Sequence, residues 1–143
     1  MKILVPVDGS KPSMEALKTA ADYAKAKNAE TYIMTVIPYV SDVDLELSAS
    51  ERDKILESMR RRGEDVLEKS KNQMHSLGVS KVNTILSTST SVAQEIVNLA
   101  EKEKVSLIVI GSKGMGATAR FLLGSVASKV VRHSHCSVHV VRE

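Results

Sequence analysis

The sequence contains no tryptophan, one phenylalanine (Phe121) and three tyrosines among its 143 residues. Its hydrophobic fraction of 43% is nevertheless ordinary for a globular protein. The core must therefore be built almost wholly from aliphatic side chains. A chain of this length can bury one such core, so we expect a single domain over residues 1–143.

Cysteine and long apolar runs are also scarce. Cys136 stands alone, so no disulfide can form within the chain and a cytoplasmic location is expected. The apolar run that begins at Ile3 is too short for a signal peptide. No stretch approaches the roughly 20 apolar residues that a membrane span needs. We therefore expect neither secretion nor a membrane partner.

An excess of one charge is missing as well. The chain has 20 Lys and Arg against 17 Asp and Glu, whereas nucleic-acid-binding domains carry a clustered positive excess. The basic run Arg60-Arg61-Arg62 is flanked by Glu57 and Glu64. Helical spacing of these charges favours a solvated face with local ion pairs. No nucleic-acid partner is expected.

Strand-like and helix-like segments alternate along the chain. The expected strands are Ile3–Val7, Thr31–Ile37, Val82–Leu86, Leu107–Ile110 and Val138–Val141. Strands separated by helices form parallel βαβ units with right-handed crossovers. We therefore predict an α/β fold: a single doubly wound domain with five parallel strands in the order 3-2-1-4-5 and helices on both faces.

Four helices are expected between these strands. Ser10 and Pro12 signal the start of the first, Ser91 and Gln94 form a capping box at the start of the third, and the last spans Ser125–His133. The second is the longest and is predicted to stop at Gly78, with Gly63 weakening it by ~1 kcal/mol relative to alanine. Its expected apolar stripe is Ile55, Met59, Val66, Met74 and Leu77.

A glycine motif follows the fourth expected strand. It reads Gly111-x-x-Gly114, nine residues, then Gly124-Ser125 at the start of the last helix. Glycines after a buried strand let main-chain N–H groups approach an anion, and a helix N-terminus attracts phosphate. The motif indicates a phosphate site built from main chain. The alternative is a tight turn with no ligand.

Asp8 ends the first expected strand. Ligands of doubly wound sheets bind at the carboxyl ends of the strands, where the strand order reverses, so Asp8 is expected near Gly111. There its carboxylate can accept hydrogen bonds from ribose hydroxyls or hold a metal; capping the first helix is the alternative. Lys113 and Arg120 either add positive charge for phosphate or are surface residues.

Other chemical motifs are missing. The sequence has no Gly-x-x-x-x-Gly-Lys-Ser/Thr loop, no dinucleotide fingerprint in the right place and no nucleophile elbow. His133, His135, Cys136 and His139 lie close together, but their spacing does not suit a metal. We expect no catalytic residue and no metal ligand among the side chains.

Taken together, these segments resemble the universal stress protein family. The matching stretches are residues 3–10, 107–114, 121–127, 132–133 and 138–142. The resemblance covers the whole chain, and the glycine spacing is typical of the family's ATP-binding branch.

The resemblance implies a site for ATP, or for ADP or AMP, with Mg²⁺ held through the phosphates. Adenine would border Pro6, Val7 and the main chain of Val36, and the ribose would lie at Asp8 and Gly111. The implied phosphate contacts are Gly114, Gly124, Ser125 and the main chain of Val126, with Gly116 in the same loop.

The resemblance also implies a homodimer that pairs the last strands, here with Val138 and Val140; His139 stands where the family usually has an aliphatic residue. The expected function is a cytoplasmic nucleotide-sensing regulatory module with slow or no hydrolysis. Two alternatives stay open: a slow ATPase or self-phosphorylating enzyme, and an interaction protein that needs no nucleotide.

Overall fold

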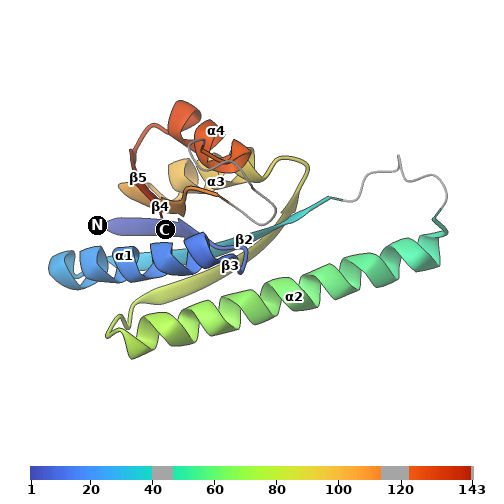
Figure 1. Ribbon diagram of the computed structural model, residues 1–143, viewed down its shortest axis with the longest axis horizontal. Helices are drawn as coiled ribbons and strands as arrows, with labels where there is room; N and C mark the ends of the chain where they lie inside the picture. Colours follow the sequence, from blue (N-terminus) through green and yellow to red (C-terminus); the bar gives the residue numbers. More distant parts are fainter. Residues whose placement is uncertain (40–46, 114–122, 143) are drawn as a thin grey trace.

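The computed structural model describes residues 1–39, 47–113 and 123–142. Strands and helices alternate through them (Figure 1). The strands are β1 (Lys2–Pro6), β2 (Glu30–Pro38), β3 (Val82–Ser89), β4 (Leu107–Gly111) and β5 (Ser137–Val141). The helices are α1 (Lys11–Lys27), α2 (Ala49–Ser76), α3 (Val92–Lys102) and α4 (Ser125–His133).

The strands form one parallel sheet in the order β3-β2-β1-β4-β5, which confirms the predicted topology. The central strand β1 pairs with β2 on one side and β4 on the other. Ile3 lies opposite Leu107 and Leu4 opposite Ile108. Because both strands run in the same direction, their carboxyl ends reach the same edge of the sheet.

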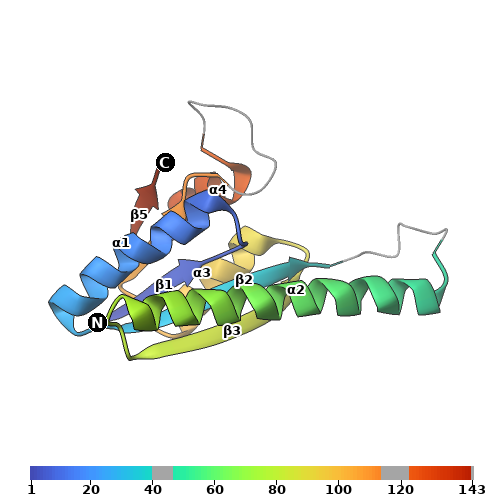
Figure 2. The same cartoon turned by 60° about the horizontal axis from the view of Figure 1, so that its bottom comes forward.

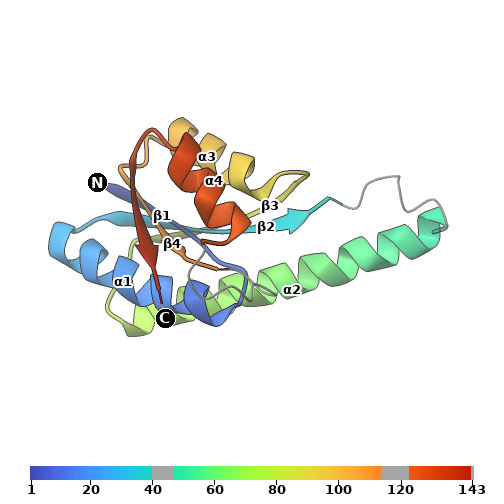
Figure 3. The same cartoon turned by 45° about the horizontal axis from the view of Figure 1, so that its top comes forward.

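Helices cover both faces of the sheet, with α1 and α2 on one face and α3 and α4 on the other (Figures 1 and 3). Each face has its own aliphatic core. Ile3, Val5 and Leu17 belong to the first core, and Leu4 and Ile96 belong to the second. Successive residues of β1 point to opposite faces, so this strand joins the two cores.

The apolar stripe of α2 was predicted only in part. Met74 is fully buried, but Ile55 is 38% exposed, and the buried positions include Leu67 and Ser70. The N-terminal part of the helix extends past the sheet (Figure 2). Apolar residues in this part of the helix recur at the spacing that is typical of a buried face, but no strand lies beneath them. The sequence does not reveal where the sheet ends.

Gly63 has a packing role that its helix propensity hides. A Cβ atom at this buried position would lie 2.8 Å from Leu86 Cδ1 and 3.5 Å from Thr35 Cγ2. Glycine therefore lets α2 approach β2 and β3 closely. The prediction that Gly63 only weakens the helix left out this contact.

The predicted capping box of α3 forms only half. Ser91 Oγ accepts a hydrogen bond from Gln94 N at 3.3 Å, as expected. The side chain of Gln94 instead donates to Asn98 Oδ1 at 2.8 Å, and Ser91 N donates to Ser89 Oγ at 3.2 Å. The serine that ends β3 therefore replaces the glutamine as the acceptor.

A polar cluster lies at the amino-terminal edge of the sheet, around Tyr32. A hydrogen bond to the Glu30 carboxylate, partial burial and the nearby charge of Glu103 raise the pKa of Tyr32 from 10.0 to about 12. The phenol also lies within 3.4 Å of Glu103 Oε2, and the ring lies beneath the Lys2 ammonium. The folded state thus favours the neutral phenol.

We expect the stability of the protein to fall between pH 10 and about 12, because the folded state keeps a proton on Tyr32 that the unfolded state loses. Below pH 10 the contribution is fully present. Urea unfolding across this range should show a steeper loss for the natural protein than for Tyr32→Phe. Equal slopes would show that Tyr32 titrates normally.

Candidate functional site

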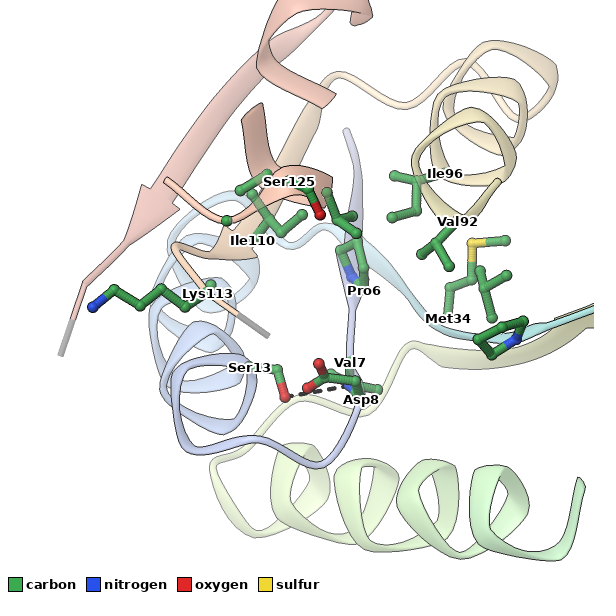
Figure 4. A pocket seen from close by; sticks show the side chains of 16 residues that line it. Pro6, Val7, Asp8, Ser13, Met34, Val92, Ile96, Ile110, Lys113 and Ser125 are labelled. Atoms are coloured by element: carbon green, nitrogen blue, oxygen red, sulfur yellow. Dashed lines mark hydrogen bonds between the residues drawn. The ribbon is translucent and has the colours of Figure 1, made fainter. Parts of the chain in front are cut away.

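A pocket of about 510 Å³ opens at the carboxyl edge of the sheet (Figure 4). It lies between the ends of β1, β2 and β4 and the first turns of α3 and α4. Every predicted site residue within the described ranges lines it: Pro6, Val7, Asp8, Val36, Gly111, Gly124, Ser125 and Val126. Gly114 and Gly116 lie outside the described residues.

The N-terminus of α4 faces this pocket. Its N-cap is Gly124, and no side chain of the described residues caps it. The first helical hydrogen bond runs from Ser128 N to Gly124 O at 2.9 Å. The N–H groups of residues 125–127 precede that bond and have no acceptor within the helix. These donors, at the positive end of the helix dipole, suit an anion.

Two main-chain hydrogen bonds fix the position of this helix start. Gly124 N donates to Ser112 O at 2.7 Å, and Ser112 N donates to Val141 O at 2.8 Å. The residue after β4 is thereby tied both to α4 and to the end of β5. The bend after Gly111 and the bend before Ser125 are therefore held together, although Gly114 itself lies outside the described residues.

Asp8 is held in a turn between β1 and α1. Its Oδ1 accepts from Ser10 N at 2.9 Å, and its own N–H donates to Ser13 Oγ at 3.4 Å. The N-cap of α1 is Ser10, whose hydroxyl accepts from Ser13 N. Asp8 is therefore not the helix cap, and its carboxylate lies at the mouth of the pocket (Figure 4).

Gly111 is required where β4 meets α1. A Cβ atom there would lie 2.8 Å from the carbonyl carbon of Pro12 and 2.9 Å from its oxygen. Real Cβ atoms essentially never come this close to main chain. The glycine thus lets the first turn of α1, and with it the Asp8 turn, lie against the end of β4.

The remaining wall of the pocket is aliphatic, and its residues were not among those predicted from the sequence. Met34 comes from β2, Val92 and Ile96 from α3, and Ile110 from β4. The spacing of Val92 and Ile96 marks one helix face, but only the tertiary structure shows that this face reaches the pocket. Apolar walls with few polar groups are typical of small-molecule sites.

Charged side chains contribute little to the pocket. Among its described lining residues only Asp8 and Lys113 are ionisable. Figure 4 shows the Lys113 amino group directed away from Asp8 and Pro6. Arg120, the other predicted cation, lies outside the described residues. Among the described residues, the attraction for an anion therefore comes mainly from main-chain N–H groups.

A sequence model of the universal stress protein family matches residues 1–142. The chain belongs to this family. A universal stress protein of Methanocaldococcus jannaschii is 39% identical over 142 residues, covering 99% of this chain and 82% of the relative. The universal stress protein YxiE of Bacillus subtilis is 35% identical and covers 99% of this chain and 98% of its own length.

Solved structures share the fold of this universal stress protein. UspA from Lactobacillus plantarum superposes with a TM-score of 0.87 at 24% identity, covering 99% of this chain and 97% of its own. A universal stress protein in complex with cAMP gives 0.72 at 25%, covering 99% and 96%. Relatives from Archaeoglobus fulgidus with dAMP and Arabidopsis thaliana with AMP share the fold at 22% and 17% identity, with TM-scores of 0.70 and 0.71.

Two absences hold for residues 1–39, 47–113 and 123–142. No helix in them is long and apolar enough to cross a membrane. No group of three or more His, Cys, Asp or Glu side chains in them could hold a metal ion. His139 Nδ1 instead lies 2.8 Å from the Tyr23 hydroxyl, and Cys136 contacts Ser134.

We expect Gly111→Ala to lower the free energy of unfolding by about 1–3 kcal/mol, because the new methyl group meets the main chain of Pro12. Urea unfolding measures the loss. Gly63→Ala is the matched control: the one atom that its methyl group would crowd is the flexible end of Leu86 at 2.8 Å, the other neighbours lie at ordinary contact distance, and alanine favours the helix. A smaller loss at Gly111 than at Gly63 would contradict the packing role.

Proposed function

We propose that this universal stress protein binds an adenine nucleotide in the pocket at the carboxyl edge of its sheet. The observation that carries the proposal is the start of α4, where main-chain N–H groups without a helical acceptor open into a cavity with an aliphatic opposite wall. Such a site suits a ligand with an anionic end and an apolar planar end. Solved relatives that hold cAMP, dAMP or AMP support the same ligand class.

The lining residues fit the three parts of such a ligand. The free N–H groups of Ser125 and Val126 would hold phosphate. Gly124, whose own N–H is bonded to Ser112 O, would let the phosphate approach without a side chain in the way. Asp8 would accept hydrogen bonds from the ribose. The base would lie against Pro6, Val7 and Val36, in line with the expectation from sequence. ATP and ADP carry enough phosphates to bind Mg²⁺ as well, and Mg²⁺ commonly keeps several waters when it binds phosphates.

The role that we propose is regulatory and cytoplasmic. Asp8 is the one described lining residue that could act as a general base, and it already accepts a hydrogen bond from Ser10 N. Rapid hydrolysis is therefore not expected. A bound nucleotide acts as a signal only if it binds two states of the protein with different affinity.

We predict that titration calorimetry with ATP, ADP and AMP detects binding to the purified protein, and that Gly124→Leu weakens it at least tenfold. Gly124 has φ −59° and ψ 160°, which any residue can adopt, so the fold should persist while the new side chain obstructs the phosphate site. Val131→Ser, on an exposed face of α4, is the control. No heat with any nucleotide would refute the proposal.

A homodimer through β5 accompanies this proposal. The strand Ser137–Val141 forms one edge of the sheet and contains no charged residue, and Val138 and Val140 are only half-buried. Unprotected edges of this kind pair readily with other strands. The side chain of His139 contacts Tyr23 of α1, with Nδ1 2.8 Å from the phenol oxygen.

We expect Val140→Glu to prevent pairing through β5, since it places two like charges in one isologous interface. Sedimentation velocity should then show a smaller species than the natural protein at the same concentration. Nucleotide binding should remain, because Val140 does not line the pocket. An unchanged mass would count against this interface.

A further inference from the structure

The opposite edge of the sheet is formed by β3 (Val82–Ser89), the outermost strand beside β2 (Figure 2). Its sequence has no charged residue, no proline and no glycine. Natural edge strands are usually protected by such residues, by bulges or by shortness. No strand in the described ranges pairs with its outer side. As far as the described residues show, a long, uncharged edge is thus unpaired.

The main-chain groups that face outward can be assigned from two hydrogen bonds. Thr31 N donates to Lys81 O and Tyr39 N donates to Ser89 O, so the odd-numbered residues of this strand direct their main chain toward β2. Alternate residues of a strand point their N–H and C=O groups in opposite directions. Thr84, Leu86 and Thr88 therefore present theirs to the outside.

Side chains on both faces of this edge are incompletely covered. Ile85 packs partly against the core under α3, and Leu86 packs partly against the core under α2. Each is half-buried, whereas the residues of the internal strand β4 are all buried. A further strand beside β3 would cover both.

Helix α2 makes a second copy of this chain a suitable neighbour. The helix packs against both β2 and β3, so its axis lies about half a strand spacing inside β3. A two-fold axis just outside β3 would place the two copies of α2 about 10 Å apart. Packed helices are typically separated by 8–10 Å. Strand pairing and helix packing could therefore be satisfied together.

The outer flank of α2 is self-complementary in charge. Ser70 and Gln73 contact Met14 of α1, so the other flank of the helix, which carries Asp53, Arg60, Glu64 and Lys71, faces away from α1. Asp53 and Lys71 lie equally far from Arg62 along the helix. The same holds for Arg60 and Glu64.

If α2 of a second copy runs antiparallel to this helix and the two cross at Arg62, Asp53 of one copy lies opposite Lys71 of the other, and Arg60 lies opposite Glu64. The other acids of this flank, Glu57 and Glu68, then lie opposite Leu67 and Leu56, so no like charges are paired.

The strand and the helix agree on the position of the axis. A Cβ atom on Gly63 would contact Leu86, so the centre of the charge pattern lies beside the middle of the strand. We propose that β3 pairs antiparallel with β3 of a second copy, with Leu86 near the two-fold axis and Thr84 opposite Thr88. This contact lies at the edge of the sheet opposite the proposed β5 interface.

Thr84→Pro tests the strand pairing. Its N–H faces outward, so proline removes a donor from the edge without breaking a bond to β2. With both interfaces intact, isologous contacts at the two edges give open chains, so sedimentation velocity should show species larger than a dimer at high concentration. Thr84→Pro or Val140→Glu alone should limit assembly to dimers, and the double variant should be monomeric.

Comparison of the natural protein, the two single variants and the double variant distinguishes pairing through β3 from pairing through β5. If only the β3 contact exists, the natural protein is a dimer and Thr84→Pro alone makes it monomeric. If Thr84→Pro leaves every mass unchanged, or if Val140→Glu is monomeric at all concentrations, the proposal is wrong. Circular dichroism and thermal melting establish that each variant is folded.

Charge reversal on α2 tests the same contact without touching the strand. In the Val140→Glu background, Asp53→Lys should weaken dimerisation about twofold to tenfold, because the new lysine faces Lys71 of the second copy. Lys71→Asp should do the same, and the two substitutions together should restore the natural affinity. Additive weakening in the double variant would overturn the antiparallel arrangement.

Discussion

The pairing of β4 with the central strand β1 is the constraint on which the rest of the structure depends. The chain builds outward from β1 to β3 on one side and then returns to β4 on the other. Helices consequently leave the two sides of this junction toward opposite faces, and the carboxyl edge between them is left hollow. Burial of β1 between two aliphatic cores holds Asp8 beside Gly111, although the two residues are far apart in sequence.

The site that results is formed mainly by main chain. Glycine is needed at Gly111 because α1 lies against it, and the uncapped start of α4 supplies its donors through N–H groups. A site of this kind tolerates changes at many surrounding side chains while its geometry persists. It also explains why few charged residues mark the pocket: the helix dipole and the oriented amides provide the favourable potential for an anion.

Neither edge strand of the sheet carries a charged residue that would prevent pairing with another strand. The surroundings of the two edges differ. At β5 the hydrogen bond from Ser112 N to Val141 O joins the edge strand to the residue that also holds the start of α4. At β3 the last residue, Ser89, is hydrogen-bonded to Ser91 at the start of α3, and α2 lies alongside the strand. The proposed assembly through β5 would thus be linked to the start of α4, whereas the proposed assembly through β3 would involve both strand pairing and the packing of α2.

The sequence by itself determined the alternation of elements, the extent of α4 and the positions of the glycine motif, because periodicity, caps and glycine are local properties of the chain. The strand order was also predicted correctly, but that prediction rests on the known pattern of doubly wound sheets and not on a local property. It did not reveal that Ile55 is exposed, that Gln94 turns toward Asn98, or that Met34 and Val92 line the pocket. Only the tertiary structure decided these points. Each depends on which distant segment lies across from the residue, and a local pattern carries no information about that neighbour.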